Sequence, residues 1–189
     1  MTIRYIADMH FDHADIIAYD NRPFDTVEEM NEVLIRNWNS VVGPEDLTYI
    51  LGDFCAGDAD RWRTHLSRLN GRKCLILGNH DDRAAAAAVS DLLEDTAEYR
   101  EMEDNGRHVV LCHYPIPAFR DHYMGWYHLY GHVHTAFEWN IAENAKRLVK
   151  NLYLRTDVCR MANVGAMVPY MGYTPRTLDE LSAYLSQNI

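Results

Sequence analysis

The most constraining feature of this sequence is a short apolar segment, repeated along the chain, that is followed by Asp, Asn or His either directly or after one glycine. Segments of this kind lie at residues 3–7, 47–51, 73–77, 107–112 and 126–130. Each is bounded by polar or turn-forming residues, which is typical of a buried strand. In an open α/β sheet, residues that follow several strands converge at the carboxyl edge of the sheet. The pattern therefore predicts a sheet whose chemically capable side chains gather at one edge.

Helical segments alternate with the first strands. Thr26 and Glu29 fit a capping box that opens an amphipathic helix, and residues 60–69 form the next expected helix. Thr177 and Glu180 fit a second capping box for a helix near the end of the chain. This alternation of strand and helix predicts an α/β class of fold.

A hairpin follows the alternating half. The turn signal Asn105-Gly106 joins residues 98–102 to residues 107–112, so two antiparallel strands are expected there. Residues 137–157 show some helical character and are otherwise left unassigned, as is the role of residues 137–176. The expected architecture is a mixed, layered α/β fold.

The length and composition suit one compact domain. The chain has 189 residues and is 48% apolar, and we expect a single domain over residues 1–189. It lacks a signal-peptide pattern and any apolar run near the roughly 18 residues that suggest a membrane span. The four cysteines form no CxxC pair, so reduced thiols are expected. We therefore expect a cytoplasmic protein with no membrane partner, and its oligomeric state stays open.

The net charge limits the partners. There are 18 Lys and Arg residues against 28 Asp and Glu residues, which gives −10. Such a charge repels a long polyanion, so duplex nucleic acid is not an expected partner. Two divalent cations in one site would add four positive charges where an anionic substrate sits. A small phosphorylated substrate, such as a nucleotide, is therefore compatible with the acidic composition.

The residues that follow the predicted strands form a chemically capable set: Asp8, His10, Asp53, Asn79, His80, His113, His132 and His134. Taken singly, each has an ordinary explanation as a loop, turn or hydrogen-bonded structural residue. Six of the ten histidines, with His13 among them, fall in these strand-end clusters. This concentration favours a shared functional site over chance placement.

In chain order, the motifs DxH, GD, GNHD, H and GHxH resemble those of the calcineurin-like metallophosphoesterase superfamily, over residues 8–134. The resemblance implies a four-layered αββα sandwich. It implies one metal ion held by Asp8, His10 and His134 and a second held by Asn79, His113 and His132, with Asp53 bridging both. The opening DMHFDH, with Asn21-Arg22-Pro23-Phe24 after it, is further similar to small stand-alone bacterial and phage phosphoesterases.

The donor types fit this implied chemistry. Carboxylate, imidazole and amide oxygen suit manganese, iron, zinc, cobalt or nickel. We expect two divalent ions, manganese first, with magnesium as a further alternative. Two ions about 3.5–4 Å apart generate hydroxide from a shared water and neutralise the phosphoryl oxygens. The expected activity is hydrolysis of a phosphomonoester or phosphodiester.

Three further residues are candidates for contacts with the substrate. We interpret His80, next to the proposed ligand Asn79, as the group that assists the leaving group. Arg22 is the candidate phosphate clamp because a guanidinium offers a bidentate fork, although an exposed loop arginine is the simpler reading. His13 either lines the pocket or stabilises the helix that follows it. Asp81 either orients His80 or belongs to the next helix, and the second interpretation is preferred.

Two other functions are alternatives to the hydrolysis of phosphate esters. A metallo-β-lactamase-type hydrolase would need an HxHxDH run, but His134 is followed by Thr135 and Ala136. A non-catalytic interaction module on the same fold would be expected to lack several ligands, whereas every ligand type is present. The run Gly52-Asp53-Phe54-Cys55 departs from the GDxxDRG of protein phosphatases. Monoester and diester substrates are not separated by the motifs.

Overall fold

A computed structural model of the protein describes residues 1–187 and contains two four-stranded sheets. The first sheet has the order β1-β2-β3-β4, with strands Ile3–Ile6, Leu47–Leu51, Arg72–Ile76 and Asp95–Ala97, all parallel. The second has the order β5-β6-β7-β8, with strands Tyr99–Asp104, Arg107–Cys112, Tyr127–Tyr130 and Arg160–Asn163. Its first pair is antiparallel and the others are parallel.

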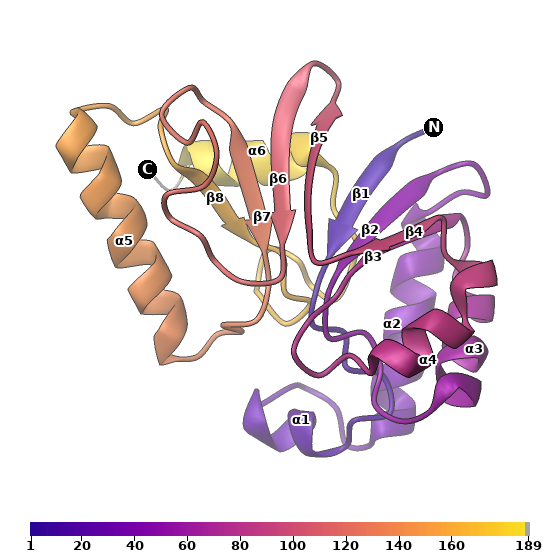
Figure 1. Ribbon diagram of the computed structural model, residues 1–189. Helices are drawn as coiled ribbons and strands as arrows, with labels where there is room; N and C mark the ends of the chain where they lie inside the picture. Colours follow the sequence, from indigo (N-terminus) through magenta and orange to yellow (C-terminus); the bar gives the residue numbers. More distant parts are fainter. Residues whose placement is uncertain (188–189) are drawn as a thin grey trace.

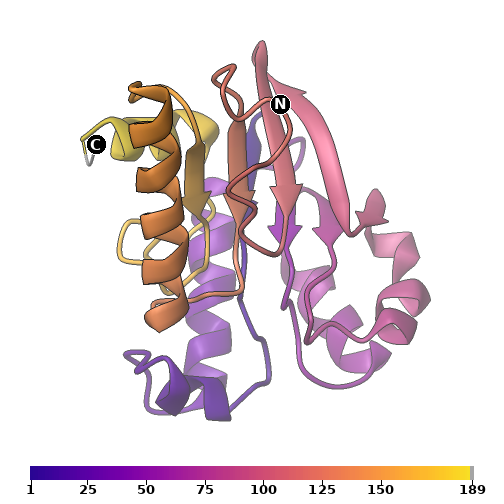
Figure 2. The same cartoon turned by 60° about the vertical axis from the view of Figure 1, so that its left-hand side comes forward.

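Helices cover the outer faces of both sheets, which gives the order helix, sheet, sheet, helix (Figures 1 and 2). The first sheet is covered by α2 (Val27–Val41), α3 (Ala59–Arg68) and α4 (Arg83–Ala88), with the short 3-10 helix η1 (Ser90–Leu92) after them. On the other side lie α5 (Phe137–Tyr153) and α6 (Leu178–Gln187). The predicted α/β, four-layered fold class is confirmed.

Local signals place several of these elements. The Thr26 side chain accepts a hydrogen bond from the backbone N–H of Glu29 and caps α2, as the capping box predicts. The hairpin between β5 and β6 is confirmed, with Asp104 paired to Arg107 across the turn. Asn105 and Gly106 both have positive φ there, the conformation that a tight two-residue hairpin requires.

The core lies between the two sheets. Val109 and Leu111 of β6 point into the cluster that also holds the buried faces of β1, β2 and β3. Val110, which lies between them, points the other way into a smaller cluster with Ala142 of α5. This alternation along one strand is why β6 can be sandwiched between a sheet and a helix. None of the helices within residues 1–187 is long and apolar enough to cross a bilayer.

Two strands and one helix differ from the sequence expectation. β4 has only three residues and no apolar run, so it carries no strand signal. β8 runs from Arg160 to Asn163, inside the segment whose role the sequence leaves unassigned. The unassigned segment from residue 137 forms a 17-residue helix, α5. The helix α1 (Asp15–Tyr19) lies beyond the carboxyl ends of the strands, beside the loops that hold the candidate site (Figure 1).

Candidate metal centre

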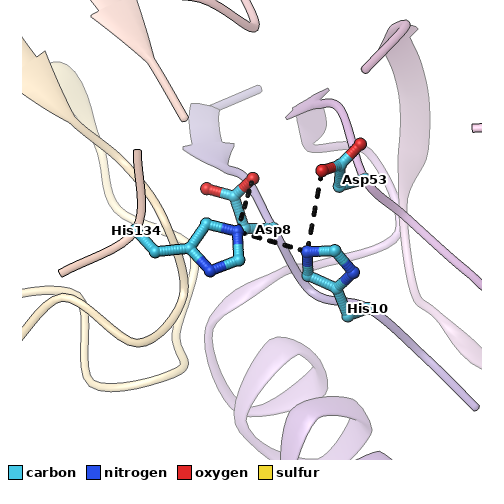
Figure 3. Close-up of side chains that lie close together, drawn as sticks. All are labelled: Asp8, His10, Asp53 and His134. Atoms are coloured by element: carbon cyan, nitrogen blue, oxygen red, sulfur yellow. Dashed lines mark hydrogen bonds and ion pairs between the residues drawn. The ribbon is translucent and has the colours of Figure 1, made fainter. Parts of the chain in front are cut away.

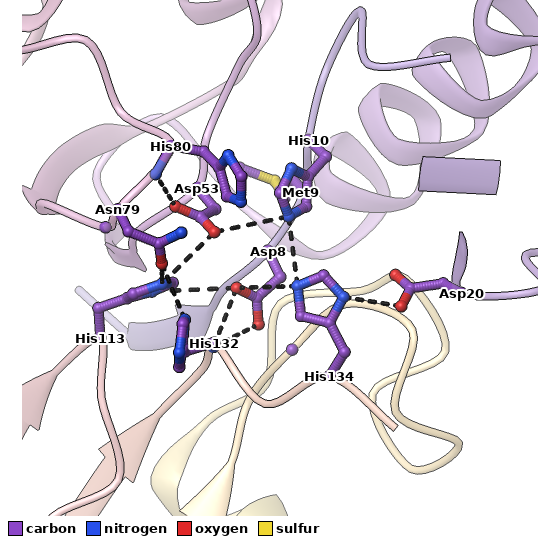
Figure 4. Close-up of polar contacts among 12 residues, drawn as sticks. Asp8, Met9, His10, Asp20, Asp53, Asn79, His80, His113, His132 and His134 are labelled. Atoms are coloured by element: carbon purple, nitrogen blue, oxygen red, sulfur yellow. Dashed lines mark hydrogen bonds and ion pairs between the residues drawn. The ribbon is translucent and has the colours of Figure 1, made fainter. Parts of the chain in front are cut away.

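The seven predicted metal ligands come together where five strands end (Figure 4). The loop after β1 supplies Asp8 and His10, the loop after β2 supplies Asp53, and the loop after β3 supplies Asn79. His113 follows β6, and His132 and His134 follow β7. The convergence follows from the topology, because the strands β1, β2, β3, β6 and β7 all deliver their carboxyl ends to this edge.

Four of these side chains form a first group: Asp8, His10, Asp53 and His134 (Figure 3). One donor atom from each lies within 4.8 Å of the others, and all four residues are buried. His10 Nε2 lies 3.3 Å from His134 Nε2 and 3.6 Å from Asp53 Oδ2. Asp8 Oδ1 lies 3.8 Å from His134 Nε2. Two imidazole nitrogens and two carboxylates thus face a common point.

A second group adjoins the first and consists of Asn79, His113 and His132 with Asp53. Asn79 Oδ1 lies 3.1 Å from His113 Nε2 and 2.8 Å from His132 Nδ1. Asp53 Oδ2 lies 3.4 Å from His113 Nε2. The same carboxylate oxygen therefore reaches His10 in the first group and His113 in the second (Figure 4).

The backbone at this site is strained. Five of the seven residues have a left-handed φ: Asp8, His10, Asp53, His132 and His134, with values of 54°, 52°, 52°, 69° and 45°. Non-glycine residues rarely adopt this region, and such strain persists only where the surroundings impose it. Because the left-handed φ values are concentrated at these five positions, we infer that the strand-end loops adopt this backbone in order to orient these side chains towards one another.

Close backbone packing also shapes the site. A Cβ added to Gly131 would lie 2.6 Å from Asp8 Oδ2 and 2.6 Å from the Ala7 Cβ. Only glycine therefore lets the β7 loop approach β1 closely enough for the His132 N–H to donate to both Asp8 oxygens, at 3.1 Å each. This contact ties the carboxylate of Asp8 to the loop that bears His132 and His134.

Burial and charge make the site suited to a cation. Burial raises the pKa of Asp8 to about 6, and burial lowers the pKa of His10 to about 2. Burial also acts to lower the pKa of His113, but Asp53 and Asp8 outweigh it and raise that pKa to about 9. Within residues 1–187, the ion-pair partners of the buried Asp8 and Asp53 carboxylates are imidazoles, with no Lys or Arg among them. Oxygen and nitrogen donors without such a counter-charge fit divalent metal ions.

The structure also identifies residues that support the site and that the sequence did not reveal. Asp20 Oδ1 lies 2.7 Å from His134 Nδ1, and Asn163 donates a hydrogen bond to the His134 carbonyl. Asp81, expected to belong to the next helix, is buried and accepts backbone N–H bonds from Asp53, Phe54 and Gly78. It thereby joins the loops after β2 and β3. Asp20 stands in no local pattern that indicates such a role, whereas Asp81 is the last residue of the GNHD motif, which could have signalled it.

Arg22 does not lie where a phosphate clamp would be. Its side chain is fully buried, and its guanidinium donates to the carbonyls of Asp8 and Met9 and to the carboxylate of Asp20. These bonds use both terminal nitrogens and Nε, so the bidentate fork is already engaged inside the protein. The geometry gives Arg22 the task of holding the strand-end loop of β1, which differs from the expected contact with substrate.

His13 and His80 line a cavity of about 330 Å³ above the two groups, together with Ile16 and Tyr19 of α1. His13 Nδ1 lies 3.2 Å from His10 Nδ1, so His13 is also a neighbour of a candidate ligand. The ring of His80 is exposed, and its centroid lies 5.5 Å from that of His10. Both residues therefore border the space in which a substrate would sit.

A second cluster with metal-binding residue types consists of Asp12, Cys55 and His65. The Asp12 carboxylate already accepts a hydrogen bond from Asn31 at 2.7 Å and forms ion pairs with His65 and Arg61 at 3.0 and 3.2 Å. With its charge compensated in this way, Asp12 is suited to fixing α3 against the β1 loop rather than to holding an ion.

Comparisons with known proteins place the chain among relatives of similar size. No family model matches it. The uncharacterised protein MJ1445 of Methanocaldococcus jannaschii is 40% identical, over 70% of this chain and 69% of that protein. The gene 66 protein of mycobacterium phage D29 is 29% identical, over 87% of this chain and 94% of that protein.

Among solved structures, AQ665 of Aquifex aeolicus, a protein of unknown function, matches with a TM-score of 0.71 and 24% identity. The match covers 97% of this chain and 98% of that chain, and it shows a shared fold. Vps29 of Entamoeba histolytica and the phosphoesterase YfcE of E. coli match at 17% identity, with TM-scores of 0.41 and 0.34. The match to Vps29 covers 71% of this chain and 66% of the Vps29 chain. The match to YfcE covers 70% of this chain and 70% of the YfcE chain.

The fold and the site define a layered α/β protein with a buried Asp and His cluster suited to divalent metal ions. By its identity to MJ1445 over more than two thirds of that protein, the chain belongs to the MJ1445 family.

Proposed function

We propose that this protein hydrolyses phosphate esters with two divalent metal ions. The observation that supports the proposal is the place of Asp53, whose Oδ2 lies 3.6 Å from His10 Nε2 and 3.4 Å from His113 Nε2. A carboxylate between two groups of donors is suited to being shared by two ions. The proposal assigns one ion to Asp8, His10 and His134 and the other to Asn79, His113 and His132.

When bound, two such ions would activate a water and offset the charge of the phosphoryl oxygens. The protein contributes by orienting the ring nitrogens of its histidines towards the metal sites. His113 Nδ1 donates to the Leu51 carbonyl at 2.8 Å, so Nε2 is the nitrogen that would give up its proton and bind a metal ion. Asp20 does the same for His134. We assign His80, at the cavity wall, the donation of a proton or hydrogen bond to the leaving group.

The lining of the cavity favours a phosphodiester over a phosphomonoester. No Lys or Arg of the described chain lines it, and Asp15 adds a negative charge at its rim. A monoester has a second ionisation near pH 6 and so carries extra negative charge at neutral pH, which no side chain here would balance. A diester carries one charge, and its second ester group would lie against Ile16 and Tyr19.

The test is hydrolysis of bis-p-nitrophenyl phosphate against p-nitrophenyl phosphate by metal-stripped protein reloaded with manganese, nickel, zinc or magnesium. We expect metal-dependent turnover, with manganese the first candidate and the diester hydrolysed faster. Asp53→Asn should lose this turnover, and Asp60→Asn, an exposed carboxylate on α3, should keep it.

The outcomes separate the parts of the proposal. Faster hydrolysis of the monoester would overturn the diester preference and leave the phosphoesterase assignment. Absence of turnover on both substrates, with both metal sites shown to be filled, would overturn the enzyme assignment in favour of a non-catalytic interaction module.

A further inference from the structure

A second cavity is lined by residues of α5, β8 and α6. These three elements lie side by side on one side of the molecule (Figure 2). Its volume is about 190 Å³, and it shares no lining residue with the cavity above the metal centre. Its lining includes Lys146 and Lys150 from α5, Arg160 from β8, and hydroxyl groups from Tyr127, Ser182 and Ser186. Nothing in the hydrolytic proposal uses these residues.

The concentration of cations here is unusual for this protein. The chain has a net charge of −10 and only three lysines, Lys73, Lys146 and Lys150. Two of the three line this one cavity, and Arg160 adds a third positive charge. Lysines that only increase solubility are expected to be spread over the surface and not to line the same cavity.

Lys150 is the least compensated of the three cations. Its Nζ forms no hydrogen bond or ion pair with any side chain or carbonyl in residues 1–187. Burial, followed by the charge of Lys146, lowers the pKa of Lys150, although Cys159 and Glu143 act in the opposite direction. Like charges held together in this way are stabilised when an anion binds between them.

The other groups at the cavity are already paired. Glu143 accepts from Lys146 at 2.8 Å, and Asp157 accepts from Arg155 at 2.9 and 2.6 Å. Arg160 Nε donates to the Asp157 carbonyl at 3.2 Å, and Nη1 donates to the Tyr127 hydroxyl at 3.0 Å. The Tyr127 hydroxyl also lies 3.0 Å from Ser182 Oγ. Glu143 and Asp157 thus each have another partner, and Lys150 Nζ and Arg160 Nη2 remain to bind a ligand.

We propose that this cavity binds a small phosphate-bearing anion, held by Lys150 and Arg160 with Lys146 beside them. Its volume of about 190 Å³ lies below the roughly 300 Å³ at which pockets for drug-sized ligands begin, so one phosphate group with a small substituent fits best. Arg160 supplies planar N–H donors, Lys150 supplies a mobile charge, and the hydroxyl groups supply neutral donors.

The test is a titration of the isotope-labelled, zinc-loaded protein with inorganic phosphate, followed by amide NMR at constant ionic strength. Amides around the cavity, such as those of Thr156, Arg160 and Ser186, should shift saturably and separately from those near the metal centre. Lys150→Gln should weaken binding at the cavity by about tenfold, because one charge-assisted hydrogen bond is lost. The same spectra report whether the variant is folded.

The matched control is Arg147→Gln, which removes one positive charge from an exposed position on the same helix. It should leave phosphate binding at the cavity within about twofold, since an exposed charge is screened. The proposal is overturned if the cavity amides do not move up to about 20 mM phosphate, where a millimolar site would be filled. It is equally overturned if both variants weaken binding to the same extent. Hydrolysis of bis-p-nitrophenyl phosphate should be the same in both variants, so the result stands apart from the proposed activity.

Discussion

Asp20 accepts a hydrogen bond of 2.7 Å from His134 Nδ1, and this bond turns the Nε2 of His134 towards Asp8 and His10. An ionised carboxylate only accepts, so Nδ1 carries the proton and Nε2 keeps its lone pair. Carboxylates in this position typically raise the basicity of a metal-binding imidazole and fix its orientation.

We predict that Asp20→Asn lowers metal affinity by about 10- to 100-fold, because the amide no longer holds His134 in one tautomer and orientation. Competition with a chelator of known affinity measures this directly. Asp60→Asn removes an exposed carboxylate from α3 and serves as the control. Equal metal affinity in the wild type and Asp20→Asn would show that His134 is not a ligand or does not depend on Asp20.

Arg22 is predicted to contribute to stability and not to substrate affinity. Its buried guanidinium bonds two carbonyls and Asp20, and removing one partner of a buried ion pair costs about 3–5 kcal/mol. Urea denaturation of Arg22→Gln should show a loss of that order, and exposed Arg36→Gln should show almost none. An Arg22→Gln variant that is as stable as wild type but has a raised KM would instead show that Arg22 binds the phosphate of the substrate.

Gly131→Ala is predicted to disturb the site from the backbone. The added methyl would lie 2.6 Å from Asp8 Oδ2, so the β7 loop must move and take His132 and His134 with it. We expect a loss of metal affinity together with roughly 1–3 kcal/mol of stability, the usual cost of overpacking. Gly43→Ala is the control, since its Cβ would lie 3.5 Å from the nearest atom. Unchanged metal binding in Gly131→Ala would show that the loop adapts.

The role of His80 is testable through the leaving group. If His80 donates to the departing oxygen, His80→Ala should slow hydrolysis of a diester with a basic phenol leaving group by about 100-fold or more. The loss should be much smaller for p-nitrophenolate, which leaves without protonation. Metal content must stay at the wild-type level, since His80 is not assigned as a ligand. Equal losses for both leaving groups would contradict the assignment.

His128 is predicted to make folding stability depend on pH. Its ring is buried, Nε2 accepts from the Ile116 N–H at 3.0 Å, and burial lowers its pKa to about 4. Above pH of about 6.5, the unfolded-state pKa, the ring is neutral in both states and the stability is complete. As the pH falls from there to about 4, only the unfolded state gains the proton, so up to roughly 3 kcal/mol is lost.

Urea denaturation between pH 7 and pH 4 measures this dependence. His128→Gln should flatten the decline, and exposed His108→Gln should leave it unchanged. Parallel declines in the wild type and His128→Gln would assign the pH dependence to other groups.

The strands and the residues that follow them could be predicted because both depend on local pattern. A five-residue run bounded by turn residues, such as Leu47–Leu51, indicates a buried strand, and Asp53 follows it by two positions. Parallel strands then bring Asp8, Asp53 and Asn79 to the same edge with no further information. The location of the proposed ligands was therefore accessible from the sequence.

The supporting residues were not accessible, because their partners are distant in sequence. Asp20 meets His134 across 114 positions, and Asn163 meets the same loop across 29. Arg22 is buried because the loop after α1 folds back onto the end of β1, where Arg22 donates to the Asp8 carbonyl. No short sequence pattern predicts this contact. The short strand β4 exists because β3 leaves an edge to pair with, not because its own residues favour it.

The central claim is that two metal ions share Asp53 and act together. The most direct measurement is turnover of bis-p-nitrophenyl phosphate during stepwise addition of manganese to metal-stripped protein, with bound metal counted in each sample. The account predicts that turnover rises as the second equivalent binds and that Asp53→Asn never reaches it. Full turnover at one equivalent, or none with two ions bound, would contradict it.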